Sequence, residues 1–291
     1  MEADRRAGQA ADLVARCVDA LHAYLELGNT TATTPLATFV THPGLPRVYD
    51  ANCVTRVRAG TPDELDALLA DMDRVYGSLS HRCVQLDPLA PAGMAARLVL
   101  DDYQPDVQLQ AVLEGPLALP AARRHPPEGV DIRPVGDEAD WAVLARLIRQ
   151  DHEETAARRG RPCWDDDVTA AMVAQKREKA PAVQFFLAAD HGVDCAFFSS
   201  WPGRPAAAPT PGAAEGPAPV GKVEDLFCAP DHRHRGIATA LIACAVADCR
   251  GRGAGPVLIG AVADDTPKKM YAALGFRPLL IATAYVSERR P

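Results

Sequence analysis

The sequence has no excess of basic residues and no long apolar run. Its 31 Lys and Arg residues are outnumbered by 38 Asp and Glu residues, which gives a formal net charge of -7. Because a surface of this kind repels phosphate backbones on average, nucleic acid is a poor expected partner. No stretch approaches the roughly 18 consecutive apolar residues of a membrane span, so we expect no membrane partner either.

Paired cysteine motifs are also missing. The eight cysteines stand singly, without the CxxC spacing of a zinc site or the density of a secreted disulfide scaffold, at positions 17, 53, 83, 163, 195, 228, 244 and 249. We therefore expect no metal ion, and thiols that stay reduced in the cytoplasm. The first thirty residues include Arg5, Arg6, Asp12 and Arg16, so no signal peptide is expected there.

The composition is that of a globular protein, and the length suits two domains. The 291 residues are 48% hydrophobic and 24% charged. Residues 115–129 are rich in proline and form the predicted linker. We predict one domain at 1–114 and a second at 130–291.

Both predicted domains alternate strands and helices, which is typical of an α/β fold. For the first, the pattern predicts helices at 12–27, 62–76 and 91–100, and strands at 37–40, 53–57, 82–86 and 107–113. For the second, it predicts helices at 138–158, 165–179, 237–250 and 267–274, and strands at 130–134, 183–188, 195–201, 223–228, 256–262 and 277–286. Thr61 and Glu64 have the spacing of a capping box. Residues 202–219 are predicted to be a mobile surface loop.

The segment 223–241 is the most informative for function. A predicted strand runs into a loop that contains Arg233, His234, Arg235 and Gly236, and an alanine-rich helix follows at once. Free backbone N–H groups and the positive end of the helix dipole converge at such a junction, which favours an anion. The small residue at 236 leaves room for a phosphate to approach the backbone.

Two motifs resemble those of the GNAT superfamily of acyl-CoA-dependent N-acyltransferases. Arg233, Gly236 and Ala238 resemble its R/Q-x-x-G-x-G/A pyrophosphate motif, and residues 270–276, Met-Tyr-Ala-Ala-Leu-Gly-Phe, resemble its L-Y-x-x-x-G-F segment. The resemblance implies a GNAT fold with a mixed central sheet flanked by helices, and acetyl-CoA or another acyl-CoA as cofactor. The residues it implies for cofactor binding are Phe227, Cys228, Ala229, Arg233, His234, Arg235, Gly236, Ile237, Ala238 and Thr239.

The same resemblance implies two side chains that transfer protons. Tyr271 takes the place of a tyrosine that lies near the CoA thiol in the family and can protonate the departing thiolate. Glu224 takes the place of the base glutamate of histone-type members, whereas many other members use a water relay. The alternatives are a packed tyrosine and a glutamate that faces solvent beside Lys222. Asp264 stands where the family often has asparagine.

Residues 52–114 repeat the strand and helix order of 223–286 but lack the RxxGxA pattern. This half resembles the degenerate copy of tandem superfamily members such as mycothiol-synthase-like proteins, so we expect a single acyl-CoA site per chain. Residues 151–154, Asp-His-Glu-Glu, form either a wall of the acceptor pocket or a solvated helix face.

The predicted function is transfer of an acetyl or related acyl group from acyl-CoA to a primary amine of a small molecule. One alternative is aminoacyl-tRNA-dependent acyl transfer. The acidic net charge argues against it, whereas the basic residues Arg123 and Arg124 and the basic loop at 233–235 argue for it. Another is a protein that senses acyl-CoA without turnover. A homodimer is also left open.

Overall fold

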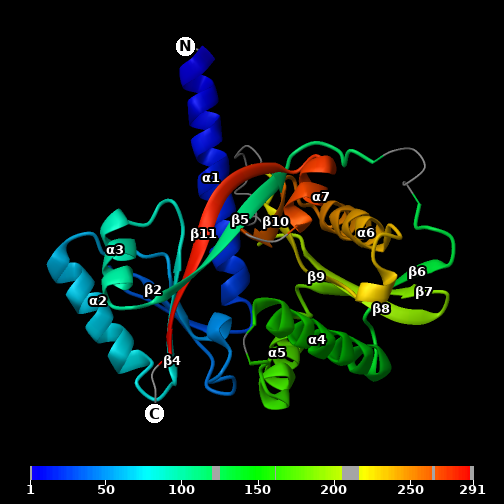
Figure 1. Ribbon diagram of the computed structural model, residues 1–291. Coiled ribbons are helices and arrows are strands. Elements are labelled where there is room, and N and C mark those ends of the chain that lie inside the picture. Colours follow the sequence, from blue (N-terminus) through cyan, green and yellow to red (C-terminus); the bar gives the residue numbers. More distant parts are fainter. Residues whose placement is uncertain (1, 120–124, 161, 205–215, 264–265, 289–291) are drawn as a thin grey trace. The chain divides into compact units, whose positions relative to one another are not determined.

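The chain folds into two compact units, neither of which is one continuous stretch of sequence. The computed structural model describes residues 2–119, 125–160, 162–204, 216–263 and 266–288 (Figure 1). The first unit comprises residues 1–111, 260–268 and 278–291, and the second comprises residues 112–259 and 269–277. Within the described ranges, no helix combines the length and apolar character needed to cross a membrane.

The first unit is a sheet with helices packed on it. Its elements are α1 (Glu2–Glu26), β1 (Thr30–Thr33), β2 (Thr38–Thr41), a short 3-10 helix (Tyr49–Ala51), β3 (Cys53–Thr55), α2 (Pro62–Val75), β4 (His81–Leu86), α3 (Ala92–Leu100), β5 (Gln104–Leu113) and β11 (Arg277–Glu288). The strands lie in the order β1, β2, β3, β4, β11, β5. Leu68 of α2 and Met94 of α3 are fully buried in the same apolar cluster as Val84 of β4.

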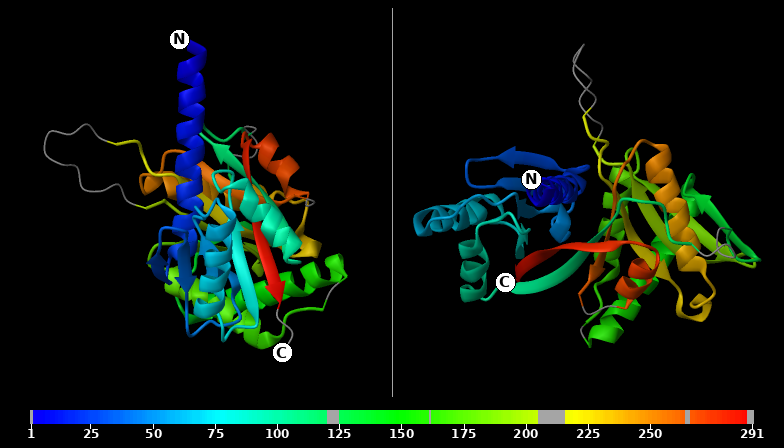
Figure 2. Two further views of the ribbon diagram at one scale, coloured as in Figure 1. Left: turned by 90° about the vertical axis from the view of Figure 1, so that its left-hand side faces the viewer. Right: turned by 90° about the horizontal axis from the view of Figure 1, so that it is seen from above.

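The C-terminal strand β11 belongs mostly to this first unit. It runs antiparallel to β4, with Thr283 opposite Leu86 and Glu288 opposite His81. On its other side it neighbours β5, and both strands can be followed in Figures 1 and 2. The sequence pattern predicts this strand as part of the second domain, 130–291. The structure pairs it with β4 of the first unit instead, and local sequence does not identify a strand's partner. The limits 1–114 and 130–291 stay a prediction.

The second unit holds the segment with the predicted site. Its elements are β6 (Val130–Pro134), α4 (Glu138–Arg159), α5 (Asp166–Lys179), β7 (Gln184–Asp190), β8 (Val193–Trp201), β9 (Gly221–Cys228), a 3-10 turn (Pro230–His232), α6 (Ile237–Gly251), the first half of β10 (Val257–Val262) and most of α7 (Pro267–Ala273). The strand order is β10, β9, β8, β7, β6, with β10 parallel to β9 and the other neighbours antiparallel. Helices α4 and α5 cover one face and α6 covers the other (Figure 1). The predicted mixed sheet flanked by helices is confirmed.

Most predicted elements are present within a few residues of their predicted ends. The capping box of α2 is confirmed, since Thr61 Oγ1 accepts a hydrogen bond from Glu64 N and the Glu64 side chain accepts one from Thr61 N at 3.0 Å. Strand β1 was not predicted, because its run of threonines has the composition of a helix-breaking loop. The central part of the predicted loop 202–219 lies outside the described residues, as do Arg123, Arg124 and Asp264.

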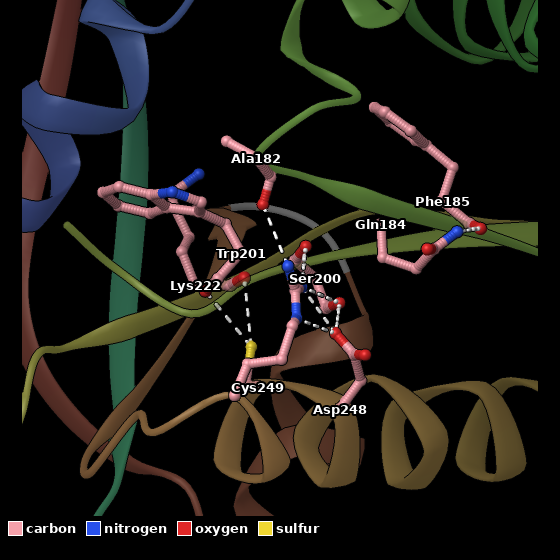
Figure 3. Close-up of polar contacts among 9 residues, drawn as sticks. Ala182, Gln184, Phe185, Ser200, Trp201, Lys222, Asp248 and Cys249 are labelled. Carbon is pink, nitrogen blue, oxygen red and sulfur yellow. Dashed lines mark hydrogen bonds and ion pairs between the residues drawn. The ribbon is translucent and has the colours of Figure 1, made fainter. Parts of the chain in front are cut away.

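Polar contacts fix the C-terminal end of α6 against the sheet (Figure 3). Arg252, just after the helix, donates hydrogen bonds to the carbonyl oxygens of Ala182 and Ser200, each at 3.0 Å. Its guanidinium also binds Asp248 at 2.9 Å, and Ser200 Oγ donates to the same carboxylate. These contacts set the direction of α6, whose opposite end starts at the loop after β9.

Candidate active site

The loop between β9 and α6 presents unpaired backbone amides. His234 has a φ of 62° and Gly236 has a φ of 86°, so both lie in the left-handed region. Ala240 N donates to Gly236 O at 3.0 Å and thereby closes the first turn of α6. The N–H groups of the three residues between them therefore have no carbonyl partner within the helix. Together with the helix dipole they form a site for an anion.

Side chains of this loop are tied to other elements of the second unit. Arg233 Nη2 donates to Glu154 of α4 at 2.6 Å, and its Nε donates to Cys228 O at 2.8 Å. Two further donors, His232 and Arg235, bind Asp190 at the end of β7. Contacts with α4 and with the end of β7 thus hold the loop that carries the predicted anion site, and the guanidinium of Arg233 is bonded to Glu154.

Strand β9 separates from β10 after a short stretch of pairing. The recorded parallel pairs join Gly221–Val223 to Val257–Ile259. Beyond them, no pair between these two strands occurs in the described chain, which leaves the β10-facing edge of residues 224–228 without a strand partner. Phe227 and Cys228, two of the residues that the resemblance implies for cofactor binding, lie on this edge. On the opposite side, Ala229 N is bonded to Cys195 O at 2.8 Å.

A β-bulge interrupts β9 next to the proposed base. The register with β8 steps from Phe197 opposite Phe227 to Ser199 opposite Glu224, so β9 contains one extra residue there. Asp225, with a φ of 67°, lies in the bulge. The bulge reorients the side chains on either side of it.

The structure places Glu224 and Asp225 in separate ion pairs. Glu224, with 33% of its side chain exposed, pairs with the buried Lys222. Asp225 pairs with Lys176 of α5 at 2.7 Å. Burial opposes ionisation of Asp225, but Lys176 outweighs that effect and lowers its pKa. Neither carboxylate is simply solvated, and the link from Asp225 to α5 was not visible in the sequence.

Tyr271 and Phe227 are buried aromatic residues. Tyr271 of α7 is 5% exposed, and its ring centroid lies 6.2 Å from that of Phe276. Phe227 packs on Phe197 with ring centroids 5.7 Å apart. Burial raises the pKa of the half-buried Cys228 thiol to about 11, which disfavours a thiolate nucleophile and leaves its backbone as the useful part.

Residues 151–154 of α4 are only partly exposed to solvent, with Glu153 the exposed member of the segment. His152 is 7% exposed and its Nδ1 lies 2.9 Å from Thr169 Oγ1. Asp151 and Glu154 are one helical turn apart and therefore share a face. Burial, together with the negative charges of Asp225 and Glu154, raises the pKa of Asp151 to about 6. Perturbed carboxylates of this kind are frequent at functional sites, and the i, i+3 spacing was the sequence signal for this pair.

Replacing Asp151 with asparagine should stabilise the protein above pH 6. The folded-state pKa of about 6 exceeds the ordinary 3.8, so the folded protein holds the proton more tightly and loses stability as pH rises from about 4 to 6. Asparagine removes that penalty, which we expect to be about 1–3 kcal/mol at pH 7.5. Urea unfolding at pH 4 and 7.5 measures it, with Glu153→Gln, an exposed carboxylate on the same helix, as the control. An equal effect of Asp151→Asn at both pH values would contradict the assigned pKa.

Residues 141–276 match the model of the Acetyltransferase (GNAT) family. This segment is a GNAT domain. It contains the β9–α6 loop and Tyr271, and the family predicted from the two motifs is confirmed. No curated protein matches the sequence.

Solved structures show the same fold over most of the chain. A GCN5-related N-acetyltransferase from Kribbella flavida is 17% identical, with a TM-score of 0.63 over 94% of this chain and 95% of that one. A functionally unknown conserved protein from Staphylococcus epidermidis is 14% identical, with a TM-score of 0.62 over 91% and 96%. A tandem GNAT protein from the clavulanic acid biosynthesis pathway is 14% identical, with a TM-score of 0.52 over 88% and 79%. At these identities the likeness shows the fold alone.

In the described part of the first unit, the start of helix α2 differs from the start of α6. At the start of its helix α2, the Glu64 carboxylate accepts hydrogen bonds from Gly60 N at 2.9 Å and Thr61 N at 3.0 Å. The negatively charged Glu64 carboxylate therefore lies at the start of α2, where it would repel a phosphate. Calorimetric titration should give one acyl-CoA per chain, and two equivalent sites would contradict this interpretation of the first unit.

Proposed function

We propose that the GNAT domain transfers an acyl group, acetyl in the simplest case, from acyl-CoA to a primary amine of a small molecule. The observation that carries the proposal is the pair of features at the end of β9. The strand loses its β10 partner there, and the unpaired amides of α6 begin after a loop with two left-handed residues. An extended arm with a pyrophosphate at one end fits such an arrangement.

The residues present fit acyl-CoA. Backbone groups of Phe227, Cys228 and Ala229 would hold the pantetheine arm along the open edge of β9. The loop and first turn of α6 would hold the pyrophosphate, through Arg233, His234, Arg235, Gly236, Ile237, Ala238 and Thr239. Gly236 has no Cβ to obstruct a phosphate. When bound, the cofactor supplies an acyl group activated as a thioester.

The chain's own side chains would move two protons. Glu224 would accept a proton from the acceptor nitrogen as the new amide bond forms, and the Tyr271 hydroxyl would give one to the sulfur as the thioester bond breaks. Asp151, on the neighbouring helix, is a second carboxylate that could take the first role. The presence of both Glu224 and Tyr271 favours an enzyme over an acyl-CoA sensor. A cytoplasmic location and a homodimer stay predictions.

A panel of amines with acetyl-CoA, read out by the free thiol of released CoA, tests the proposal. Release that depends on a primary amine and stops when the amine is acylated beforehand would support it. A thermal shift series with acetyl-CoA and with charged tRNA separates the alternatives. Stabilisation by acetyl-CoA without turnover on any amine would favour the sensor, and stabilisation by charged tRNA alone would favour the tRNA-dependent reaction.

A further inference from the structure

Asp190 is a buried carboxylate that binds two residues of the β9–α6 loop, which comprises residues 229–236. It is the last residue of β7, and its side chain is 4% exposed. Its Oδ2 lies 2.8 Å from His232 Nδ1 and 2.7 Å from Arg235 Nη1. The hydrogen bond from His232, helped by Arg235, lowers the pKa of Asp190 despite its burial. An ionised carboxylate only accepts hydrogen bonds, so the proton in the first contact lies on His232 Nδ1.

The two donors stand on either side of the left-handed residue that shapes the loop. His234, with a φ of 62°, lies between His232 and Arg235. A single oxygen atom therefore spans the turn that aims the backbone amides into the first turn of α6. Asp190 belongs to the β7–β8 hairpin, which is paired from Gln184 opposite Ser200 to Asp190 opposite Val193, with one shift of register between Ala188 and Ala189.

We infer that Asp190 is a positioning residue that holds the β9–α6 loop in its phosphate-binding form and thereby sets the affinity of the domain for CoA. The inference rests on the proposed function. A loop fixed before binding loses less conformational freedom when the pyrophosphate arrives, so affinity rises without any contact between Asp190 and the ligand.

Because Asp190 is negatively charged, the direction in which its replacement changes the affinity for CoA tests the inference. A carboxylate near a phosphate site repels the ligand, so by Coulomb's law alone its neutralisation should strengthen CoA binding. Loss of positioning should weaken CoA binding. A purely structural role should lower the melting temperature and leave the affinity of the folded protein unchanged.

Calorimetric titration of the full chain with CoA distinguishes these outcomes. We expect Asp190→Asn to raise Kd about tenfold or more, because two charge-assisted hydrogen bonds are lost. The matched control is Asp194→Asn in the same hairpin, whose carboxylate binds Arg133 at 2.6 and 3.0 Å, and its Kd should stay within about twofold of wild type. Equal or tighter binding by folded Asp190→Asn would overturn the inference.

If Asp190→Asn does not fold, two variants of His232 test the same inference. His232→Asn keeps an N–H donor close to the position of the imidazole Nδ1, whereas His232→Ala removes it. We expect His232→Ala to weaken CoA binding and His232→Asn to restore most of the affinity. Equal affinities of the two variants would count against the inference. If wild-type protein itself fails to bind CoA, it is the proposed function that fails.

Discussion

Replacing Gly236 with valine should abolish measurable CoA binding while the protein stays folded. The residue has a φ of 86°, which an L residue with a branched side chain rarely adopts, and a Cβ there would lie 3.2 Å from Pro127 Cγ. The added side chain would stand beside the free amides of α6, where the pyrophosphate must approach. Calorimetry should show a Kd raised by about 100-fold or more, since several hydrogen bonds to a charged ligand are lost together.

The chain offers a matched control for this substitution at the other end of the same helix. Gly253 has a φ of 96°, and a Cβ there would meet nothing within 4 Å. Gly253→Val therefore brings comparable backbone strain, about 1–2 kcal/mol, far from the phosphate site. We expect both variants to lose similar stability and only Gly236→Val to lose CoA. Unchanged affinity of a folded Gly236→Val would remove the pyrophosphate assignment.

Turnover should fall strongly when either Tyr271 or Glu224 is replaced. Tyr271→Phe and Glu224→Gln should each lower kcat by about 10²–10⁴-fold with an amine substrate, because general acid or base assistance is typically of that size. CoA affinity should stay near that of wild type. Tyr271→Phe keeps the ring that packs near Phe276, so a tyrosine with only a packing role would show altered stability and an unaltered kcat.

The pH dependence of kcat/KM separates the two roles. Loss of the base should flatten the acidic limb, and loss of the acid should flatten the basic limb. Glu153→Gln, at a carboxylate that is 57% exposed and paired with Arg149, is the control and should leave both limbs in place. Wild-type rates for Glu224→Gln at every pH would leave Asp151 or a water relay as the proton acceptor, while the fold and the cofactor assignment would stand.

The outlines of the fold could be predicted from residues close together in sequence. The β9–α6 junction and the capping box of α2 each depend on a few consecutive residues, whose backbone preferences hold wherever the segment lies. For that reason Arg233, Gly236 and Ala238 were enough to predict an anion site at the start of α6, and that site remains a prediction. The roles of Glu224 and Tyr271 came from a resemblance and remain predictions.

The long-range contacts around the candidate site could not be predicted from neighbouring residues in the sequence. Asp190 precedes His191 and Gly192, and in the sequence it is a turn residue of a hairpin. Its contacts with His232 and Arg235 arise only when β7 comes to lie beside the loop after β9, a separation of 42 and 45 residues. The ion pair between Lys176 and Asp225 likewise depends on α5 packing over the bulge in β9.

The sequence by itself therefore predicted the family, most of the element order and an anion site at the start of α6, because each prediction follows from short-range patterns of backbone conformation and side-chain size. The tertiary structure alone decided which strand partners β11 takes, where β9 loses its pairing, and which carboxylates become buried. Those outcomes depend on burial and long-range pairing, which bring together groups far apart in the chain. They change the pKa of Asp151 and the contacts of Asp190 in ways that no local pattern records.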